Sequence, residues 1–335
     1  MIEPKSYESM AAFSYENFEE AKLNPLPAPK LVKNGKSRVL LVRVASRTEA
    51  IHTCITQMGG WKFLLEGTKS RDVLLKPNLN TEDPFPASTH LDTIKTVTDS
   101  LLESGMADRV IIGDSSGFGG GFNTYSTMQN MGIVEFAEQR ERVELSCFEH
   151  EEFVRVFPEK ATFWKNGIIV PRRIITTENI VSLPAMKTHQ GQEFTLSIKE
   201  TVGPCHPKCR EEFHASPDSK EMIAELCLTY APKFVILDGT KCFINRGPTV
   251  GDLAEPRVMI AGDDRVAVDA VGVAVMKATG SPALEKSIWE FGQIKRASEL
   301  GIGVDSPDKI LLEPIDPTNS DEFNVFVDDI REFLH

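Results

Sequence analysis

Side chains that can bind anions, bind metals or transfer protons recur directly after short apolar segments of this sequence. Five segments end this way, and the groups that follow them are Lys76 and Asn78, then Asp114, Ser115, Ser116 and Gly117, then Lys187 and His189, then Asp238, and last Asp263 and Asp264. Each group alone is also typical of a turn or a helix cap. If the segments are parallel strands, however, their carboxyl ends meet at one edge of a sheet. We therefore expect these groups to form one anion- or metal-binding cleft.

The segment 184–200 is the richest in such side chains. Lys187 and His189 are two residues apart, so they share one face if the segment is extended. Lys199 follows ten residues after His189. Lysines beside a histidine suit an anion site in which the lysines hold the phosphate or carboxylate and His189 acts as acid or base near neutral pH. The alternative is a surface loop with scattered charges.

Residues 113–121 (GDSSGFGGG) form a loop rich in glycine and serine. Backbone N–H groups in such loops can surround an anion. The loop lacks the GK[ST] ending of a Walker A motif and the spacing of a dinucleotide-binding fingerprint, and a flexible loop over the site is the alternative. Asp114 and Asp238 are expected to bind a divalent cation or to orient the histidine, because hard cations prefer carboxylate oxygens.

Cys205 and Cys209 form a C-x3-C pair with His206 and His214 close by. This set can hold a soft metal, although its spacing is not a standard zinc pattern. An ordinary loop is the alternative. A further polar residue, Asp269, lies in an apolar helical segment and is expected to pair with a cation or a backbone N–H, or else to face the cleft, because an unpaired buried carboxylate is costly. A structural and a catalytic role are both open for it.

Short apolar segments typical of strands alternate along the chain with segments of helical periodicity. Strands are expected at 38–44, 72–76, 109–112, 143–148, 168–170, 179–183, 234–237 and 257–261, and helices at 48–65, 90–103, 130–138, 219–230, 265–279 and 287–300. This alternation predicts the α/β class, with a largely parallel sheet flanked by helices. The expected organisation is an N-terminal arm over residues 1–36, a body over 37–310 and a C-terminal tail over 311–335. The pair VLLKPN and VIIGDSSG is similar to the pair IVSLPAMK and FVILDG. In each pair one strand ends at a proline near a lysine, and the next ends at an aspartate beside a glycine. This similarity indicates either two related halves or only the common form of βα turns.

Composition narrows the class of protein. The 335 residues carry a net charge of -12, which disfavours nucleic acid and an acidic membrane surface as partners. Apolar runs are far shorter than the roughly 20 residues that span a bilayer, and the N-terminus shows no signal peptide. Six cysteines without a signal indicate free thiols in a reducing compartment, so we expect a cytoplasmic protein.

The chain resembles the domain of unknown function 362 family. The matching segments are LLKPNLN (74–80), GDSSG (113–117), LPAMKTH (183–189), TLSIKETVG (195–203), ILDG (236–239), RGP (246–248) and DRVAVDAVG (264–272). The resemblance implies an α/β body. Some relatives carry a ferredoxin-like iron–sulfur module, but this chain has no CxxCxxC run. It also departs from the family at Lys199-Glu200, where Lys-Asn is usual.

Three functions remain open at this point. An enzyme that binds a small anionic metabolite in a Lys/Asp/His cleft, with or without a divalent metal, is favoured, and its reaction could be hydrolysis, isomerisation or group transfer. The alternatives are a metal- or iron–sulfur-dependent redox protein using Cys205, Cys209 and His189, and a non-catalytic binding or assembly protein that forms a homo-oligomer or engages another chain through its N-terminal arm.

Overall fold

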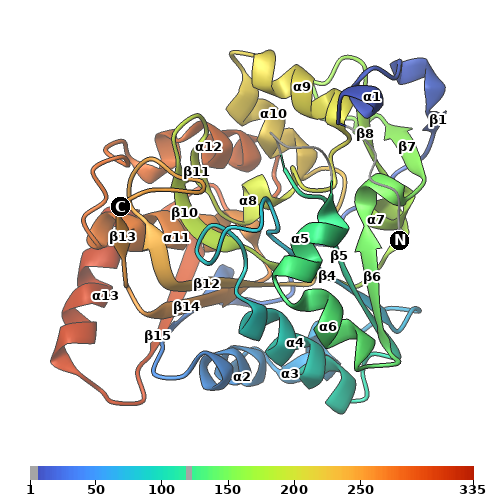
Figure 1. Cartoon of the computed structure of the whole chain (residues 1–335). Coiled ribbons are helices and arrows are strands. Elements are labelled where there is room, and N and C mark those ends of the chain that lie inside the picture. The colour runs from blue at the N-terminus through green and yellow to red at the C-terminus, as the bar shows by residue number, and fades with distance from the viewer. Residues whose placement is uncertain (1–6, 118–122) are drawn as a thin grey trace.

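One mostly parallel sheet forms the centre of the molecule (Figure 1), seen in a computed structural model that describes residues 7–117 and 123–335. In spatial order its strands are β15 (Ile310–Ile315), β3 (Lys36–Arg43), β14 (Val258–Gly262), β12 (Phe234–Phe243), β9 (Ile180–Leu183), β4 (Asp72–Pro77), β5 (Arg109–Asp114) and β6 (Val143–Cys147). In this series β14 is antiparallel to both of its neighbours, and the other adjacent pairs are parallel. The predicted α/β class is confirmed.

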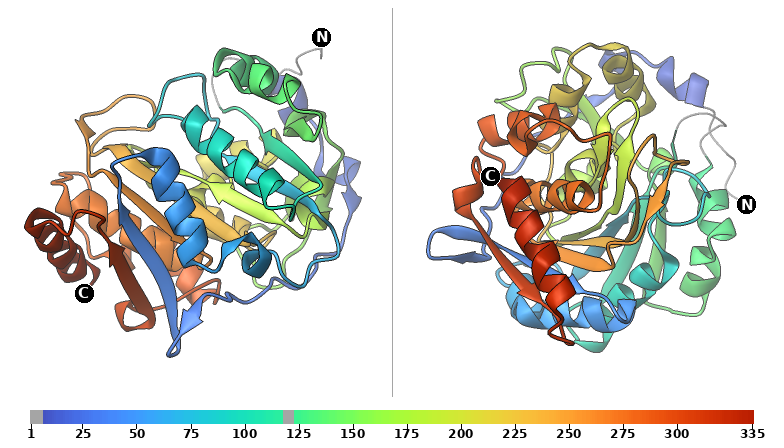
Figure 2. Two further views of the ribbon diagram at one scale, coloured as in Figure 1. Left: turned by 90° about the horizontal axis from the view of Figure 1, so that it is seen from below. Right: turned by 90° about the vertical axis from the view of Figure 1, so that its left-hand side faces the viewer.

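Helices cover both faces of this sheet (Figure 2). Successive strand residues point to opposite faces, so Val39 and Leu41 belong to one apolar core, and Leu40 and Val42 to the other. The second core is closed by α2 (Arg47–Gln57), α3 (Gly60–Leu64), α4 (Leu91–Glu103), α5 (Thr124–Asn130) and α6 (Ile133–Glu138). The first is closed by α7 (Arg172–Thr176), α8 (Ser197–Glu200), α9 (Pro207–Ala215), α10 (Ser219–Leu226), α11 (Arg265–Ala278), α12 (Gly292–Glu299) and α13 (Asp321–Leu334).

Most predicted elements appear near their expected bounds, but the helix expected over 48–65 is divided. It consists of α2 and α3, separated at Gly59 and Gly60, whose φ angles are 96° and 75°. A left-handed backbone cannot continue a right-handed helix. Asp264 caps α11 by accepting from the backbone N–H of Ala267 at 3.0 Å, which confirms the cap predicted for Asp263-Asp264.

Smaller elements complete the sheets. A hairpin of β10 (Ala185–His189) and β11 (Glu193–Thr195) joins the main sheet through β12, where β13 (Leu253–Ala254) also pairs; β2 (Val32–Lys33) pairs with β3. A separate sheet contains β1 (Glu19–Glu20), β7 (Phe153–Val156) and β8 (Ile168–Pro171). The α1 helix (Tyr7–Ala11) lies against α9.

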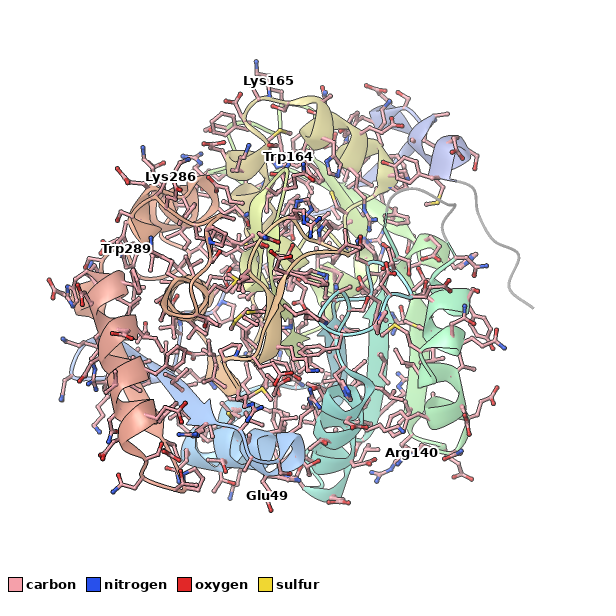
Figure 3. The ribbon with its side chains drawn as sticks, turned by 60° about the vertical axis from the view of Figure 1, so that its left-hand side comes forward. Glu49, Arg140, Trp164, Lys165, Lys286 and Trp289 are labelled. Carbon is pink, nitrogen blue, oxygen red and sulfur yellow. The ribbon has the colours of Figure 1, made fainter. Side chains whose placement is uncertain are left out.

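The segment expected as a C-terminal tail adds a strand and a helix to the body. Strand β15 pairs with β3, and α13 packs against α11. The indole N–H of Trp289, which lies beside α13 in Figure 3, donates to the carbonyl of Leu334 at 2.9 Å. Through residues 7–117 and 123–335, no helix combines the length and apolar character that crossing a membrane requires.

The direction of β14 corrects one expectation. Because β14 is antiparallel to its neighbours, Asp263 and Asp264 lie beyond the amino-terminal ends of the adjacent strands. The other polar groups that follow strands lie at the carboxyl-terminal ends. Asp264 accepts from the hydroxyl of Ser37 at the start of β3, at 2.8 Å. These two aspartates therefore do not join the other groups.

Candidate anion-binding site

The innermost feature of the site is an ion pair between adjacent strand ends. Strands β4 and β5 are paired in parallel, which brings Lys76 and Asp114 together as the sequence predicted. Lys76 Nζ lies 2.7 Å from Asp114 Oδ1, and both side chains are buried. Asp114 Oδ2 also accepts from the backbone N–H of Leu79 at 2.7 Å. The Asp114 carboxylate is thus already balanced by a cation and a backbone donor.

Lys187 and His189 enter the site from β10. Alternate residues of an extended strand share a face, and both side chains line the same cavity, as predicted. Lys187 Nζ donates to Asn78 Oδ1 at 2.8 Å and to the carbonyl of Ala87. His189 Nδ1 accepts from the backbone N–H of Gly191 at 3.2 Å. The neutral ring therefore carries its proton on Nε2.

Lys199 comes from α8, which lies near the centre of the molecule in Figure 1. The first turn of α8 is held by Asp269 of α11, whose carboxylate accepts from the backbone N–H groups of Ser197 and Ile198 at 2.9 and 2.8 Å. This confirms the backbone partners expected for Asp269. The Lys199 ammonium lines the cavity and forms no hydrogen bond or ion pair within the described parts of the chain. It is therefore the cation of this site that is available to a ligand.

Arg210 is a buried member of the site that the sequence analysis missed. Arg210 lies in α9. Its guanidinium donates to the backbone oxygens of Ser115 and Gly203 and, at 2.5 Å, to the Ser115 hydroxyl. The sequence drew attention to Cys205 and Cys209, which precede it, whereas only packing shows that the arginine fixes the backbone after β5. Ser116 contributes its carbonyl to Arg210 as well.

Gly203 was also missed, and its lack of a side chain is required. A β-carbon there would lie 2.3 Å from Asp114 Oδ1 and 2.7 Å from Lys76 Nζ. The backbone thus approaches the buried ion pair more closely than any other residue type allows. The "TVG" that ends the TLSIKETVG segment is the signal that could have identified it.

Together these groups enclose a cavity of about 40 Å³. That is space for roughly three water molecules, and hence for one small oxyanionic group. Its lining residues are Asn78, Asn80, Asp114, Ser115, Lys187, His189, Thr195, Lys199, Val202, Gly203, Arg210 and Pro248. Six predicted residues are among them, and Lys76 lies outside the lining but pairs with Asp114, which belongs to it.

The other predicted residues lie outside the lining. Gly117 donates its N–H to the carbonyl of Asn80 at 2.5 Å, and Ser116 is buried behind Ser115. Residues 118–121 of the glycine-rich loop lie outside the described residues, so the predicted anion cradle there is not addressed.

Asp238 does not face this cavity, which corrects its predicted place. Its carboxylate accepts from Arg47 Nε of α2 and from the Thr93 hydroxyl of α4, both at 2.8 Å, and from the Thr240 hydroxyl at 2.7 Å. Because α2 and α4 supply its partners, Asp238 joins helices to the sheet. It cannot share a cation with Asp114 at this site.

Cys205 and Cys209 do not fit a metal ion or an iron–sulfur cluster. Both thiols are buried in the core, and Cys209 Sγ accepts from the backbone N–H of Ile169 at 3.3 Å. Burial raises the pKa of the Cys205 thiol well above its usual range. In the described ranges no three His, Cys, Asp or Glu side chains are arranged to hold a metal ion.

Burial and mutual repulsion set the protonation of the cavity. Burial, and then the charge of Lys199, lower the pKa of Lys187 to about 7; burial and Arg210 lower that of Lys199 to about 8. Burial and the two lysines lower the pKa of His189 to about 2. The imidazole is therefore neutral, and Lys187 rather than His189 titrates near neutral pH.

Glu200, which follows Lys199 in α8, is buried beside the ion pair. One of its carboxylate oxygens accepts from the Ser182 hydroxyl, and the other has no partner among the described residues. Burial raises its pKa to about 7, against the attraction of Lys76. Glu200 is thus a second group in this region that exchanges a proton near neutral pH.

The fold and the cavity define an α/β protein with a cation-rich pocket at the ends of parallel strands. The chain belongs to the family of the domain of unknown function DUF362, whose model matches residues 73–274. A thylakoid-associated protein of Synechocystis sp. is 24% identical over 281 residues, covering 79% of this chain and 81% of that protein. The lactate racemase apoprotein of Thermoanaerobacterium thermosaccharolyticum has a TM-score of 0.44 and 12% identity, over 93% of this chain and 90% of its own.

Proposed function

We propose that this protein is an enzyme that binds the carboxylate or phosphate group of a small metabolite in the cavity between β4, β5, β10 and α8. The observation that carries the proposal is the ammonium of Lys199, which has no partner among the described residues and lines the cavity beside Lys187 and Arg210. Asp114 contributes a carboxylate to the lining, and its ion pair with Lys76 already offsets that charge. A small anion would offset the excess of positive charge that the fold encloses.

Lys187 is the residue we assign to proton transfer. A group whose pKa lies near the working pH serves best as general acid or base, and Lys187 meets this condition while His189 does not. Asn78 fixes the position of the Lys187 ammonium. Neutral His189, with its proton on Nε2, would donate a hydrogen bond to the bound anion. A divalent metal is not needed to hold the anion, since the lysines supply the charge.

The proposal also includes the cellular compartment of the protein and the class of its ligand. All six cysteines are free and buried, which supports a reducing compartment such as the cytoplasm. The acidic chain as a whole favours a small anionic metabolite, rather than nucleic acid, as the ligand of its enclosed basic site.

Calorimetric titration with acetate and with inorganic phosphate tests the anion site. The wild type is expected to bind at least one of them saturably, and Lys199→Met to bind it roughly tenfold or more weakly, because one unpaired charge is lost. Lys295→Met, which removes an exposed lysine of α12, is the matched control and should bind like the wild type. Equal affinities in Lys199→Met and the wild type would contradict the proposal.

A separate experiment tests catalysis. A panel of small carboxylates and phosphate monoesters is incubated with the protein in D2O and followed by NMR for deuterium incorporation or product. Lys187→Met is expected to abolish any turnover that the wild type and Lys295→Met both show. Full turnover in Lys187→Met would remove this residue from the reaction.

A further inference from the structure

A larger hollow lies between the N-terminal arm and the body, away from the cavity described above. It measures about 1010 Å³ and is bounded by arm residues 20–31 on one side and by residues 157–160, 227–233 and 300–302 on the other. We call it the arm groove. Of the residues predicted from sequence to form the cleft, Asp263 lines it. Its size is at the upper end of the range for small-molecule sites, roughly 300–1,000 Å³.

The walls of the arm groove are largely apolar. The arm contributes Leu23 and Leu26 together with Pro25, Pro27 and Pro29. Across from it, Phe157 is a large apolar side chain that remains 51% exposed. Exposed apolar surface that lines a concave space is characteristic of a ligand site.

Arg265, the first residue of α11, lines the groove from within the body. It is only 3% exposed. Its Nη1 donates to the carbonyl of Tyr230 at 3.2 Å, and its guanidinium carbon lies 4.4 Å from the centre of the Tyr230 ring. Its Nε and Nη2 have no hydrogen-bond partner in the described residues. The thiol of Cys227 beside it is at best a weak acceptor.

A buried guanidinium with two donors that make no hydrogen bond in the described residues is suited to binding an oxyanion. Leaving buried charged donors unpaired is costly, whereas a carboxylate or phosphate accepts two parallel hydrogen bonds from a guanidinium. The Tyr230 hydroxyl, also buried and without a partner in the described chain, adds a third donor on a residue that lines the groove. Three carboxylates line the groove, those of Glu20, Glu159 and Asp263. Glu20 pairs with Arg155 at 2.7 Å, and Asp263 Oδ2 accepts from the backbone N–H groups of Lys30 and Leu31, while Asp263 Oδ1 has no partner in the described residues.

We propose that the arm groove binds an amphipathic organic anion. Its carboxylate or phosphate group would meet Arg265, and its apolar part would lie between the proline-containing arm and Phe157. This inference is independent of the function proposed for the small cavity, because no residue lines both spaces.

Titration calorimetry with three ligands of one chain length tests this inference. Dodecanoate and dodecyl phosphate carry the two candidate head groups, and dodecanol is the neutral control; all are used below their micellar concentrations. The wild type is expected to bind one or both anions saturably, and dodecanol at least about tenfold more weakly. The anion that binds more tightly identifies the head group. Absence of saturable binding by both anions, or equal binding of dodecanol, would overturn the proposal.

Variants locate the bound anion. Arg265→Gln should remove the preference for anions over dodecanol. Because Arg265 is buried and its variant can fail to fold, Leu26→Glu on the arm and Phe157→Ser on the facing wall provide a second test, and each should weaken dodecanoate binding about tenfold. Val325→Ser, at an exposed valine of α13, should bind like the wild type. Unchanged binding in Leu26→Glu and Phe157→Ser would place the ligand elsewhere and refute the inference.

Discussion

Lys76 Nζ and Asp114 Oδ1 lie 2.7 Å apart, with the lysine side chain fully buried and the aspartate nearly so. Removing one member of such a pair leaves an uncompensated buried charge, at a cost of about 3–5 kcal/mol. Lys76→Met is therefore expected to lower the free energy of unfolding by about this amount, as measured by urea denaturation.

The exposed pair Arg71–Asp108 is the control for this prediction, since its side chains are 55% and 66% exposed. Arg71→Met should change stability by less than about 1 kcal/mol. The double variant Lys76→Met/Asp114→Asn should be less destabilised than the sum of its parts, because no unpaired charge remains. Strict additivity would show that the two side chains do not act as a pair.

Gly203→Ala is expected to destabilise the protein by about 1–3 kcal/mol, because its new methyl group would collide with the ion pair. The anion affinity of the small cavity should fall as well, and the two effects are measured by denaturation and by acetate titration. At Gly191 a β-carbon would come no closer than 3.9 Å to any atom. Gly191→Ala should therefore be tolerated, and equal effects of the two substitutions would argue against the close approach at Gly203.

Acetate binding should weaken as pH rises through the pKa values of Lys187 and Lys199, about 7 and about 8. Below this range both ammonium groups are charged and attract the anion, and above it both are neutral. Acetate itself remains ionised throughout, so calorimetry near pH 6 and near pH 9 reports on the protein, with an expected loss of roughly tenfold. In Lys187→Met, acetate affinity should fall only near pH 8, where Lys199 loses its proton. Constant affinity across this range would exclude both lysines as the titrating groups.

Glu200 gives a prediction about stability and pH. Its folded-state pKa is raised to about 7, so between its ordinary value and pH 7 the folded state holds more protons than the unfolded state. Stability contributed by this group is present at low pH and lost as pH rises through about 7.

Glu200→Gln removes that titration. The melting temperature of the variant should rise relative to the wild type between about pH 5 and about pH 8. The comparison is a difference between two proteins, so it cancels Asp269, whose pKa burial also raises to about 7. Glu285→Gln, at an exposed glutamate, should track the wild type at both pH values. A constant difference for Glu200→Gln would mean that this carboxyl is not the titrating group.

The last helix is predicted to be essential to the fold. Ile330 of α13 is fully buried against the body, whereas Val325 of the same helix is 61% exposed. Ile330→Ser should cost about 2–5 kcal/mol of unfolding free energy, and Val325→Ser less than about 0.5 kcal/mol. Similar losses at the two positions would show that α13 does not pack on the body as described.

Local sequence patterns predicted much of the site because they depend on neighbours along the chain. The spacing of Lys187 and His189 placed both on one face of an extended segment, and the ends of β4 and β5 brought Lys76 and Asp114 together. Asp269 in an apolar helix had to find backbone donors, and it did so at the start of α8. Each of these inferences needed only strand or helix geometry and the cost of burying charge.

Partners drawn from distant segments could not be predicted in the same way. Arg47 of α2 forms an ion pair with Asp238, and Arg210 of α9 fixes the backbone after β5. The near-neutral pKa expected for His189 is wrong, because burial lowers it first and the two lysines lower it further. The lysines are visible in the sequence, but the burial is not.

The sequence by itself determined the alternation of strands and helices, the α/β class and the polar residues that end the strands, because apolar periodicity and turn chemistry are local. Only the tertiary structure decided which of those residues meet. The antiparallel β14 carries Asp263 and Asp264 to the opposite end of the strands. Packing leaves Lys199 without a partner among the described residues and encloses Cys205 and Cys209. Strand direction and charge pairing are settled by contacts between segments far apart in the chain, and their energies exist only once the chain has packed.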